Sequence, residues 1–128
     1  MKKIVEVRSL KTGGHVIIDN EPCRIVSIST SQTGKHGSAK ARIEAIGIFD
    51  DQKRSLVKPV DSKIEVPIIE KKSAQVIAVM ENTVQLMDLE TYDVFELEKP
   101  KDLEKELVEG AEIEYWISLD KMKVSRVK

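Results

Sequence analysis

The sequence predicts an all-β protein made of two small domains. Short apolar runs alternate with turn residues along the chain and are not interleaved with helices, a pattern typical of small barrels or sandwiches. Only 4% of the 128 residues are aromatic, so the core must consist of Ile, Val, Leu and Met, as is common in small β domains. Length alone allows one ordinary domain or two very small ones, and a polar boundary near the middle favours two.

The first half is expected to form a succession of short strands. Its apolar and β-branched runs predict strands at 15–18, 23–29, 40–48, 55–60 and 63–69. Turns are expected at residues 19–22, which read Asp-Asn-Glu-Pro, and at Asp50-Asp51, because Asp, Asn and Pro favour turn conformations. These strands predict a small barrel or a sandwich.

The second half is expected to hold five strands and one short helix. The strands are predicted at 74–80, 84–89, 94–97, 113–119 and 122–126, with turns at Glu81-Asn82 and Asp120-Lys121. The segment 101–109 (KDLEKELVE) is predicted to be a helix, because Pro100 precedes it and Gly110 follows it. Five strands with a helix before the last two match an OB-like barrel.

Charge divides the chain at a polar segment, 70–73, which lies between two apolar runs. Residues 1–70 carry 12 Lys and Arg against 9 Asp and Glu (net +3), and residues 71–128 carry 9 against 13 (net −4). We therefore place the two domains at 1–70 and 71–128. No apolar run is long enough to cross a bilayer and no apolar segment follows the basic start, so a cytoplasmic protein without membrane contact is expected.

No acidic residue occurs between positions 21 and 44, a stretch that holds the basic residues Arg24, Lys35, Lys40 and Arg42. Positive charge with no neighbouring carboxylate suits contact with a phosphate backbone. A solvated face that lacks acids by chance explains the composition equally well. Cys23 is the single cysteine, which excludes an intrachain disulfide and a multi-cysteine zinc site, and it is expected to be a small buried hydrophobe.

Residues 29–40 form a loop between two predicted strands that is longer than the roughly two to five residues usual in a hairpin. Gly34 and Gly37 flank its tip and permit backbone angles closed to other residues, so Lys35 is expected at the end of a protruding arm. A solvent-exposed loop with an incidental lysine is the alternative. A phosphate-binding loop is disfavoured, because a serine replaces its first glycine, a histidine follows the lysine, and a strand rather than a helix comes next.

The run STSQTGKHGSAKARIEAIGIF (29–49) closely resembles the modification loop of the translation initiation factor 5A family, the archaeal and eukaryotic counterpart of bacterial elongation factor P. The opening EVRSLKTGGHVIIDNEPCRIV (6–26) is similar to the family's first strands, and the second half matches its OB-like domain in layout. The resemblance implies an N-terminal SH3-like (KOW-type) small barrel followed by a C-terminal OB-fold barrel with one short helix. Gln32, Ser38 and the absence of an acidic N-terminal extension indicate an archaeal-type member.

In that family the lysine between Gly and His-Gly is modified, and this position falls on Lys35. The resemblance implies that an NAD-dependent deoxyhypusine synthase transfers an aminobutyl group from spermidine to this lysine, giving deoxyhypusine or, after hydroxylation, hypusine. It also implies a translation factor, not an enzyme, that binds ribosomal RNA beside peptidyl-tRNA and promotes peptide-bond formation at stalling sequences such as proline runs. No bound cofactor or metal is expected, and the protein is expected to be a monomer.

The other loop residues have expected roles as well. Contact with the modifying enzyme or with RNA is predicted for Thr33, Gly34, His36, Gly37, Lys40 and Arg42. The two glycines would shape the tip, His36 would stack on RNA or face solvent, and the two basic residues would contact phosphates, joined by Arg24 if its strand faces that way.

Three residues outside the loop also have expected places. His15 lies in an apolar stretch and is expected to be structural. Tyr115 and Trp116 point to opposite sides of one strand, so one is expected in the barrel and the other exposed for stacking.

Two other functions remain open on the sequence. An unmodified RNA-binding module of two small barrels would share the fold and need no spermidine chemistry; the mass of the peptide that contains Lys35 separates it from the first hypothesis. A phosphotransferase or nucleotidase is the second, although the sequence lacks a metal-binding carboxylate constellation and a phosphate loop. Absence of nucleotide turnover would dismiss it.

Overall fold

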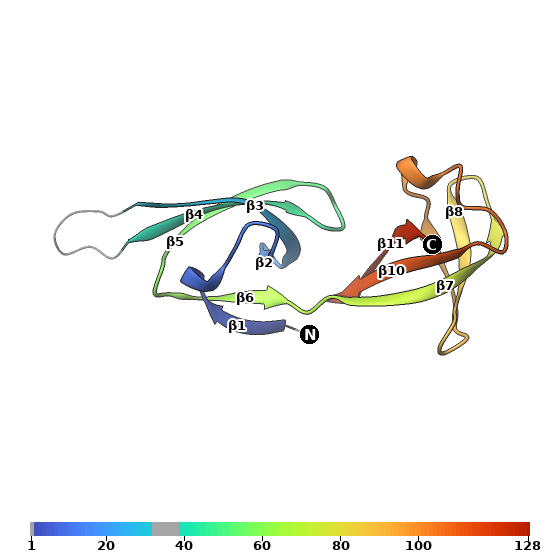
Figure 1. Cartoon of the computed structure of the whole chain (residues 1–128), viewed down its shortest axis with the longest axis horizontal. Coiled ribbons are helices and arrows are strands. Elements are labelled where there is room, and N and C mark those ends of the chain that lie inside the picture. Colours follow the sequence, from blue (N-terminus) through green and yellow to red (C-terminus); the bar gives the residue numbers. More distant parts are fainter. Residues whose placement is uncertain (1, 32–38) are drawn as a thin grey trace. The chain divides into compact units, whose positions relative to one another are not determined.

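A computed structural model describes residues 2–31 and 39–128 and confirms the all-β prediction (Figure 1). The chain divides into two compact units, Met1–Ile68 and Ile69–Lys128. The polar segment 70–73, which we predicted as the boundary, lies within strand β7 (Glu70–Val79). Its charged side chains mark the solvent-exposed start of a strand and not a linker, because a strand end tolerates charge wherever its side chains reach water.

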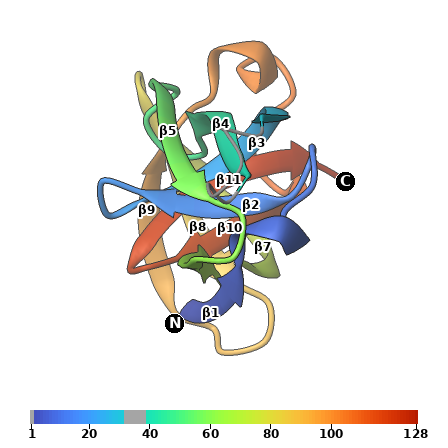
Figure 2. The same cartoon turned by 90° about the vertical axis from the view of Figure 1, so that its left-hand side faces the viewer.

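The first unit is a small SH3-like barrel of two antiparallel sheets (Figure 1 and Figure 2). A two-stranded sheet pairs β1 (Lys2–Glu6) with β6 (Lys63–Pro67). A four-stranded sheet runs in the order β2 (His15–Ile18), β3 (Glu21–Ser31), β4 (Lys40–Gly47) and β5 (Lys53–Pro59). A 3-10 helix at Val7–Ser9 follows β1. The buried core is aliphatic, as predicted, and consists of Val7, Val16, Ile18, Cys23, Ile25, Ala41, Ile43, Ala45 and Ile64.

Strand β1 was not predicted, and the first turn is shorter than the predicted 19–22. Four of the five side chains of β1 are exposed, so the strand lacks the alternation that reveals a half-buried strand. Only Asp19 and Asn20 form the turn between β2 and β3, with φ of 53° and 63°. Two residues with positive φ are typical of the tight hairpin turn whose twist matches its strands.

The second unit is an OB fold whose five strands form one antiparallel sheet in the order β11-β10-β7-β8-β9. The strands after β7 are β8 (Thr83–Asp88), β9 (Val94–Glu98), β10 (Glu112–Ser118) and β11 (Lys121–Val127). Its core is a separate cluster of buried residues, namely Ala74, Val76, Val84, Leu86, Leu107, Ile113, Tyr115 and Val124. The last turn consists of Leu119 and Asp120, one residue earlier than predicted.

The helix predicted over 101–109 is wrong for most of its length. Only Lys101–Leu103 is helical, as a 3-10 helix, and turn residues follow it. Leu107 is buried to 2% exposure, and the backbone N–H groups of Glu106 and Leu107 both donate to the carbonyl of Leu103. A segment this short cannot sustain an α-helix by propensity alone, so burial of its leucines decides the path of the backbone.

A buried carboxylate, Asp88, ties the core of the second unit to a turn. Its Oδ2 accepts a short hydrogen bond from the Tyr115 hydroxyl, and its Oδ1 accepts 2.8 Å bonds from the backbone N–H groups of Glu90 and Thr91. Burial opposes ionisation, but these three donors outweigh it and place the pKa of Asp88 below its ordinary value. Burial and the neighbouring Asp88 raise the pKa of Tyr115. Tyr115 is therefore the aromatic residue that packs inside the barrel, which confirms one half of the prediction for the Tyr-Trp pair.

Candidate functional site

The predicted functional loop joins β3 to β4. These strands pair antiparallel up to Ser31 and Lys40, where the described part of the hairpin ends. Five of the predicted contact residues lie outside the described residues: Thr33, Gly34, Lys35, His36 and Gly37. The structure therefore bears on the base of the loop and on the strands that carry it.

Lys40 and Arg42 both lie on the exposed face of β4, at the end nearest the loop. Two positions apart on one strand, they point to the same side of the sheet. Arg42 Nε lies 3.5 Å from Glu44 Oε1, and Glu44 Oε2 accepts a 3.1 Å hydrogen bond from the Ser27 hydroxyl. The base of the loop thus offers two exposed cations, one of which is partly balanced by a carboxylate.

Arg24 lies on the same face of the sheet, toward the other end of β3. It pairs with Ile46 of β4, two positions beyond Glu44 in the same alternation. A β-bulge between Ile25 and Ser27 inserts one extra residue into β3. Beyond the bulge, β3 and β4 again pair residue by residue as far as the loop. Arg24 therefore faces the same side of the sheet as Lys40 and Arg42, which its predicted role requires. It does not lie at the base of the loop.

The opposite face of β4 anchors the hairpin in the core. Ala41, Ile43 and Ala45 alternate with the exposed residues and are at most 2% exposed. Each deeply buried side chain removes apolar area from water, worth roughly 1.5–3 kcal/mol for an isoleucine. The loop therefore extends from two strands that are fixed by one continuous hydrophobic cluster.

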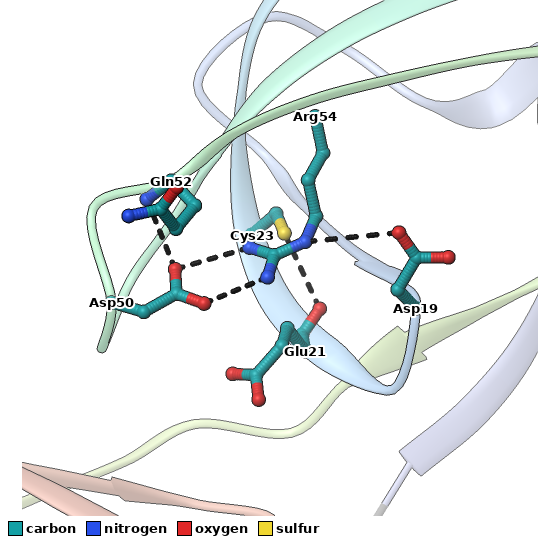
Figure 3. Close-up of polar contacts among 6 residues, drawn as sticks. All are labelled: Asp19, Glu21, Cys23, Asp50, Gln52 and Arg54. Carbon is teal, nitrogen blue, oxygen red and sulfur yellow. Dashed lines mark hydrogen bonds and ion pairs between the residues drawn. The ribbon is translucent and has the colours of Figure 1, made fainter.

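Asp50 and Arg54 form an ion pair at the other end of β4 (Figure 3). This ion pair was not predicted from the sequence. Arg54 Nη1 and Nη2 donate to Asp50 Oδ1 and Oδ2 at 3.0 and 2.7 Å, and the backbone N–H of Gln52 donates to Oδ1 at 3.0 Å. Arg54 Nε lies 3.9 Å from Asp19 Oδ2 in the turn between β2 and β3. The pair thereby connects two hairpin turns of the first unit.

The ion pair sets the protonation of its neighbours. Hydrogen bonds from Arg54, and then from the backbone of Gln52, lower the pKa of Asp50 to about 2, and the same contact raises the pKa of Arg54. Burial raises the pKa of the Cys23 thiol, and Arg54 opposes this only in part. Cys23 has no exposed surface, which confirms that it is a small buried residue.

Gly47 is required by this ion pair. A Cβ placed at Gly47 would overlap Asp50 Oδ1 and would lie 2.8 Å from Arg54 Nη1. We expect Gly47→Ala to push Asp50 away from Arg54 and to lower the free energy of unfolding by about 1–3 kcal/mol, measured by urea unfolding followed by circular dichroism. The same substitution in an Asp50→Ala background should cost clearly less; equal costs in the two backgrounds would contradict this explanation.

The ion pair also predicts a pH dependence of stability. Because the pKa of Asp50 falls from 3.8 to about 2 on folding, its contribution is complete above about pH 4 and is lost as the pH falls through about 2. We expect the unfolding free energy of the protein to decrease over this window. Asp50→Asn should show a flatter profile between pH 4 and pH 2, and a profile as steep as that of the unsubstituted protein would refute the assignment.

His15 is the remaining candidate residue of the first unit. His15 is half-buried in β2 and pairs with Arg24 across the sheet. Among residues 2–31 and 39–128, no three His, Cys, Asp or Glu side chains form a group suited to a metal ion. In the same described ranges, no helix has the length and apolar character needed to span a bilayer.

Comparison with known proteins decides the family. Residues 3–62 match the family described as translation initiation factor 5A-like, N-terminal, and residues 68–128 match eukaryotic elongation factor 5A hypusine, DNA-binding OB fold. The chain belongs to the translation initiation factor 5A family. Translation initiation factor 5A from Methanothermobacter thermautotrophicus is 61% identical over 127 residues, which cover 99% of this chain and 98% of the relative. The same factor from Archaeoglobus fulgidus is 60% identical over 127 residues, covering 99% of both chains.

Solved structures of the translation initiation factor 5A family have the same fold. A eukaryotic translation initiation factor 5A from Methanococcus jannaschii superposes with a TM-score of 0.92 at 48% identity, over 99% of this chain and 95% of that one. A translation initiation factor eif-5a family protein from Naegleria fowleri superposes with a TM-score of 0.81 at 29% identity, over 99% and 98%. These findings confirm the SH3-like and OB-fold domains and identify the protein as a translation factor.

Proposed function

We propose that this factor binds the ribosome next to peptidyl-tRNA and promotes peptide-bond formation at stalling sequences such as proline runs, acting through hypusine or deoxyhypusine at Lys35. The observation that carries the proposal is the Gly-Lys-His-Gly tip in a chain that belongs to the translation initiation factor 5A family. The base of the loop supports it, because Lys40 and Arg42 are exposed on one face of β4 and suited to RNA phosphates.

The chemistry of the modification explains why a lysine is needed at the tip. A lysine side chain reaches about 6 Å from its Cα, and four more carbons and a nitrogen roughly double that reach. The extended chain carries two amines, both cationic in water. It is therefore a slim, doubly charged group that enters an RNA crevice too narrow for other side chains and binds phosphate and 2′-hydroxyl oxygens there.

Such a group acts by positioning, and the chemical step belongs to the ribosome. Holding the acceptor end of peptidyl-tRNA in its reactive geometry removes an orientational cost from peptide-bond formation. This benefit is greatest where the nascent chain disfavours that geometry, as consecutive prolines do. The factor itself supplies no catalytic residue.

The proposal includes partners and a place in the cell. A deoxyhypusine synthase that uses NAD transfers the aminobutyl group of spermidine to the Lys35 amine. The factor then works as a cytoplasmic monomer whose partners are ribosomal RNA and peptidyl-tRNA. It needs no bound cofactor, because the aminobutyl group is attached covalently.

Mass spectrometry of the loop peptide from the native organism tests the proposal. The peptide that contains Lys35 is expected to be heavier than its sequence by one aminobutyl group, with one further oxygen if it carries hypusine. The same peptide from protein made without deoxyhypusine synthase is the control and should have the unmodified mass. A native peptide with an unmodified lysine, from protein that fully supports translation, would instead favour the unmodified RNA-binding module.

A further inference from the structure

Trp116 lies between two lysines on the outward face of the second unit. It lies in β10, between β7 and β11, and pairs with Lys71 of β7 on one side and Lys123 of β11 on the other. The Nζ atoms of these lysines lie 5.1 and 5.8 Å from the centroid of the indole ring. Trp116 is half-buried, and its indole N–H donates a 3.1 Å hydrogen bond to Glu114 Oε1. An indole with a cation on each neighbouring strand combines a stacking surface with two phosphate-binding groups.

The carboxylates around this site are paired with other cations. Glu70 lies 3.8 Å from Lys72, Glu114 3.6 Å from Arg126, and Glu112 3.5 Å from Lys128. No carboxylate in the described part of the chain pairs with Lys71 or Lys123. The two lysines beside the indole are therefore suited to an external anion.

Basic and acidic residues are distributed unevenly among the strands of the second unit. Residues 69–80 and 112–128, which form β7, β10 and β11, carry six basic and four acidic residues, net +2. Residues 81–111, which form β8, β9 and the turns that follow, carry three basic and ten acidic residues, net −7. An OB fold usually binds oligonucleotides on the face of its second and third strands, which are β8 and β9 here. Those two strands carry Asp88, Glu96 and Glu98 and no basic residue, so they attract a polyanion less than the face with Trp116 does.

We propose that the outward face of β7, β10 and β11 binds a single-stranded RNA segment, with one base stacked on Trp116 and flanking phosphates held by Lys71 and Lys123. The site is separate from Lys35 and needs no modification of the chain. It gives the factor a second RNA contact, on its OB-fold unit, in place of the usual face. Because stacking accepts any base, the contact depends weakly on sequence and strongly on salt.

Intrinsic fluorescence provides a local test, because Trp116 is the single tryptophan in the sequence. Full-length protein made without deoxyhypusine synthase is titrated with a uridine hexanucleotide at low salt. We expect saturable quenching, and we expect Lys71→Gln/Lys123→Gln to weaken binding at least about tenfold. Loss of two phosphate contacts on a single strand should also reduce the slope of log affinity against log salt by about 1.4.

Substitutions at the ring and in the acidic region supply the controls. With a labelled hexanucleotide and fluorescence anisotropy, Trp116→Leu should weaken binding by roughly 5- to 150-fold, and Trp116→Phe should retain most of the affinity. Lys99→Gln/Lys101→Gln removes the same charge from residues 81–111 and should leave affinity unchanged within about twofold. Thermal unfolding establishes that each variant is folded.

Three results would overturn the proposal. They are no binding of the hexanucleotide, binding that leaves Trp116 fluorescence unchanged, and equal affinity for the two double-glutamine variants. None of them bears on Lys35, because the protein in the assay is unmodified. Failure here therefore leaves the proposed action at proline runs intact, and failure of that action leaves this site intact.

Discussion

Replacing Lys35 with arginine is expected to abolish the relief of stalling at proline runs. Arginine keeps the positive charge but offers no primary amine to accept the aminobutyl group, so the long dicationic side chain never forms. The exchange is between two long cationic side chains, so it adds no apolar group and no backbone constraint. We therefore expect a free energy of unfolding within about 0.5 kcal/mol of that of the unsubstituted protein.

A reconstituted translation assay measures this result. Synthesis through a proline run should fall to the level seen without factor, while synthesis of a proline-poor message changes little. Lys53→Arg, a lysine-to-arginine change on exposed β5, is the matched control and should keep full activity. Full activity of Lys35→Arg would refute the proposed function, whatever its effect on stability.

Replacing Asp88 with alanine is expected to be strongly destabilising for the second unit. Asp88 is 2% exposed, and its loss leaves the Tyr115 hydroxyl and the N–H groups of Glu90 and Thr91 without their acceptor. Breaking a buried, charged hydrogen-bond network of this kind costs about 3–5 kcal/mol. Urea unfolding followed by the fluorescence of Trp116 measures the effect, because the single tryptophan lies in this unit.

Two conservative variants separate the hydrogen bonds from the volume of the side chain. Asp88→Asn keeps an oxygen acceptor for the turn, and Tyr115→Phe removes only the hydroxyl, so each should cost about 1–2 kcal/mol. The pKa of Asp88 is lowered on folding, so its stabilising effect is present above its unfolded pKa and is lost as the pH falls through its folded pKa. An Asp88→Ala variant as stable as the unsubstituted protein would show that the network contributes no net stability.

Local patterns in the sequence predicted most of the strands and the position of the loop. Strands such as β2 and β10 have alternating or continuous apolar residues, and this pattern predicts which face is buried. The exposed strand β1 has no such apolar pattern, because its pairing with β6 depends on backbone hydrogen bonds. The helix over 101–109 failed for the opposite reason: its local propensity is strong, but burial of Leu107 prevails.

Some of the site residues were likewise predictable from local sequence patterns, and others were not. Lys40 and Arg42 were predictable, because two basic residues two positions apart on a strand share a face. Asp50 and Arg54 carry no motif, and only the tight turn after Gly47 brings them together. Likewise Asp88 and Tyr115 are 27 positions apart in sequence, so their hydrogen bond arises from the sheet and not from local spacing.

The bulge in β3 determines where a one-residue deletion leaves the faces of the strand unchanged. Val26 is the extra residue between Ile25 and Ser27, and the pairing of Ser27 with Glu44 continues as though it were absent. Deleting Val26 would give an evenly paired ladder with every later side chain on its present side. Deleting Ser27 would have the same result, because Val26 would take its place opposite Glu44, whereas a deletion outside the bulge would exchange core and solvent positions between the bulge and the gap. Homologues that are one residue shorter in β3 are thus compatible with an unchanged basic face when the gap falls within the bulge, at Val26 or Ser27.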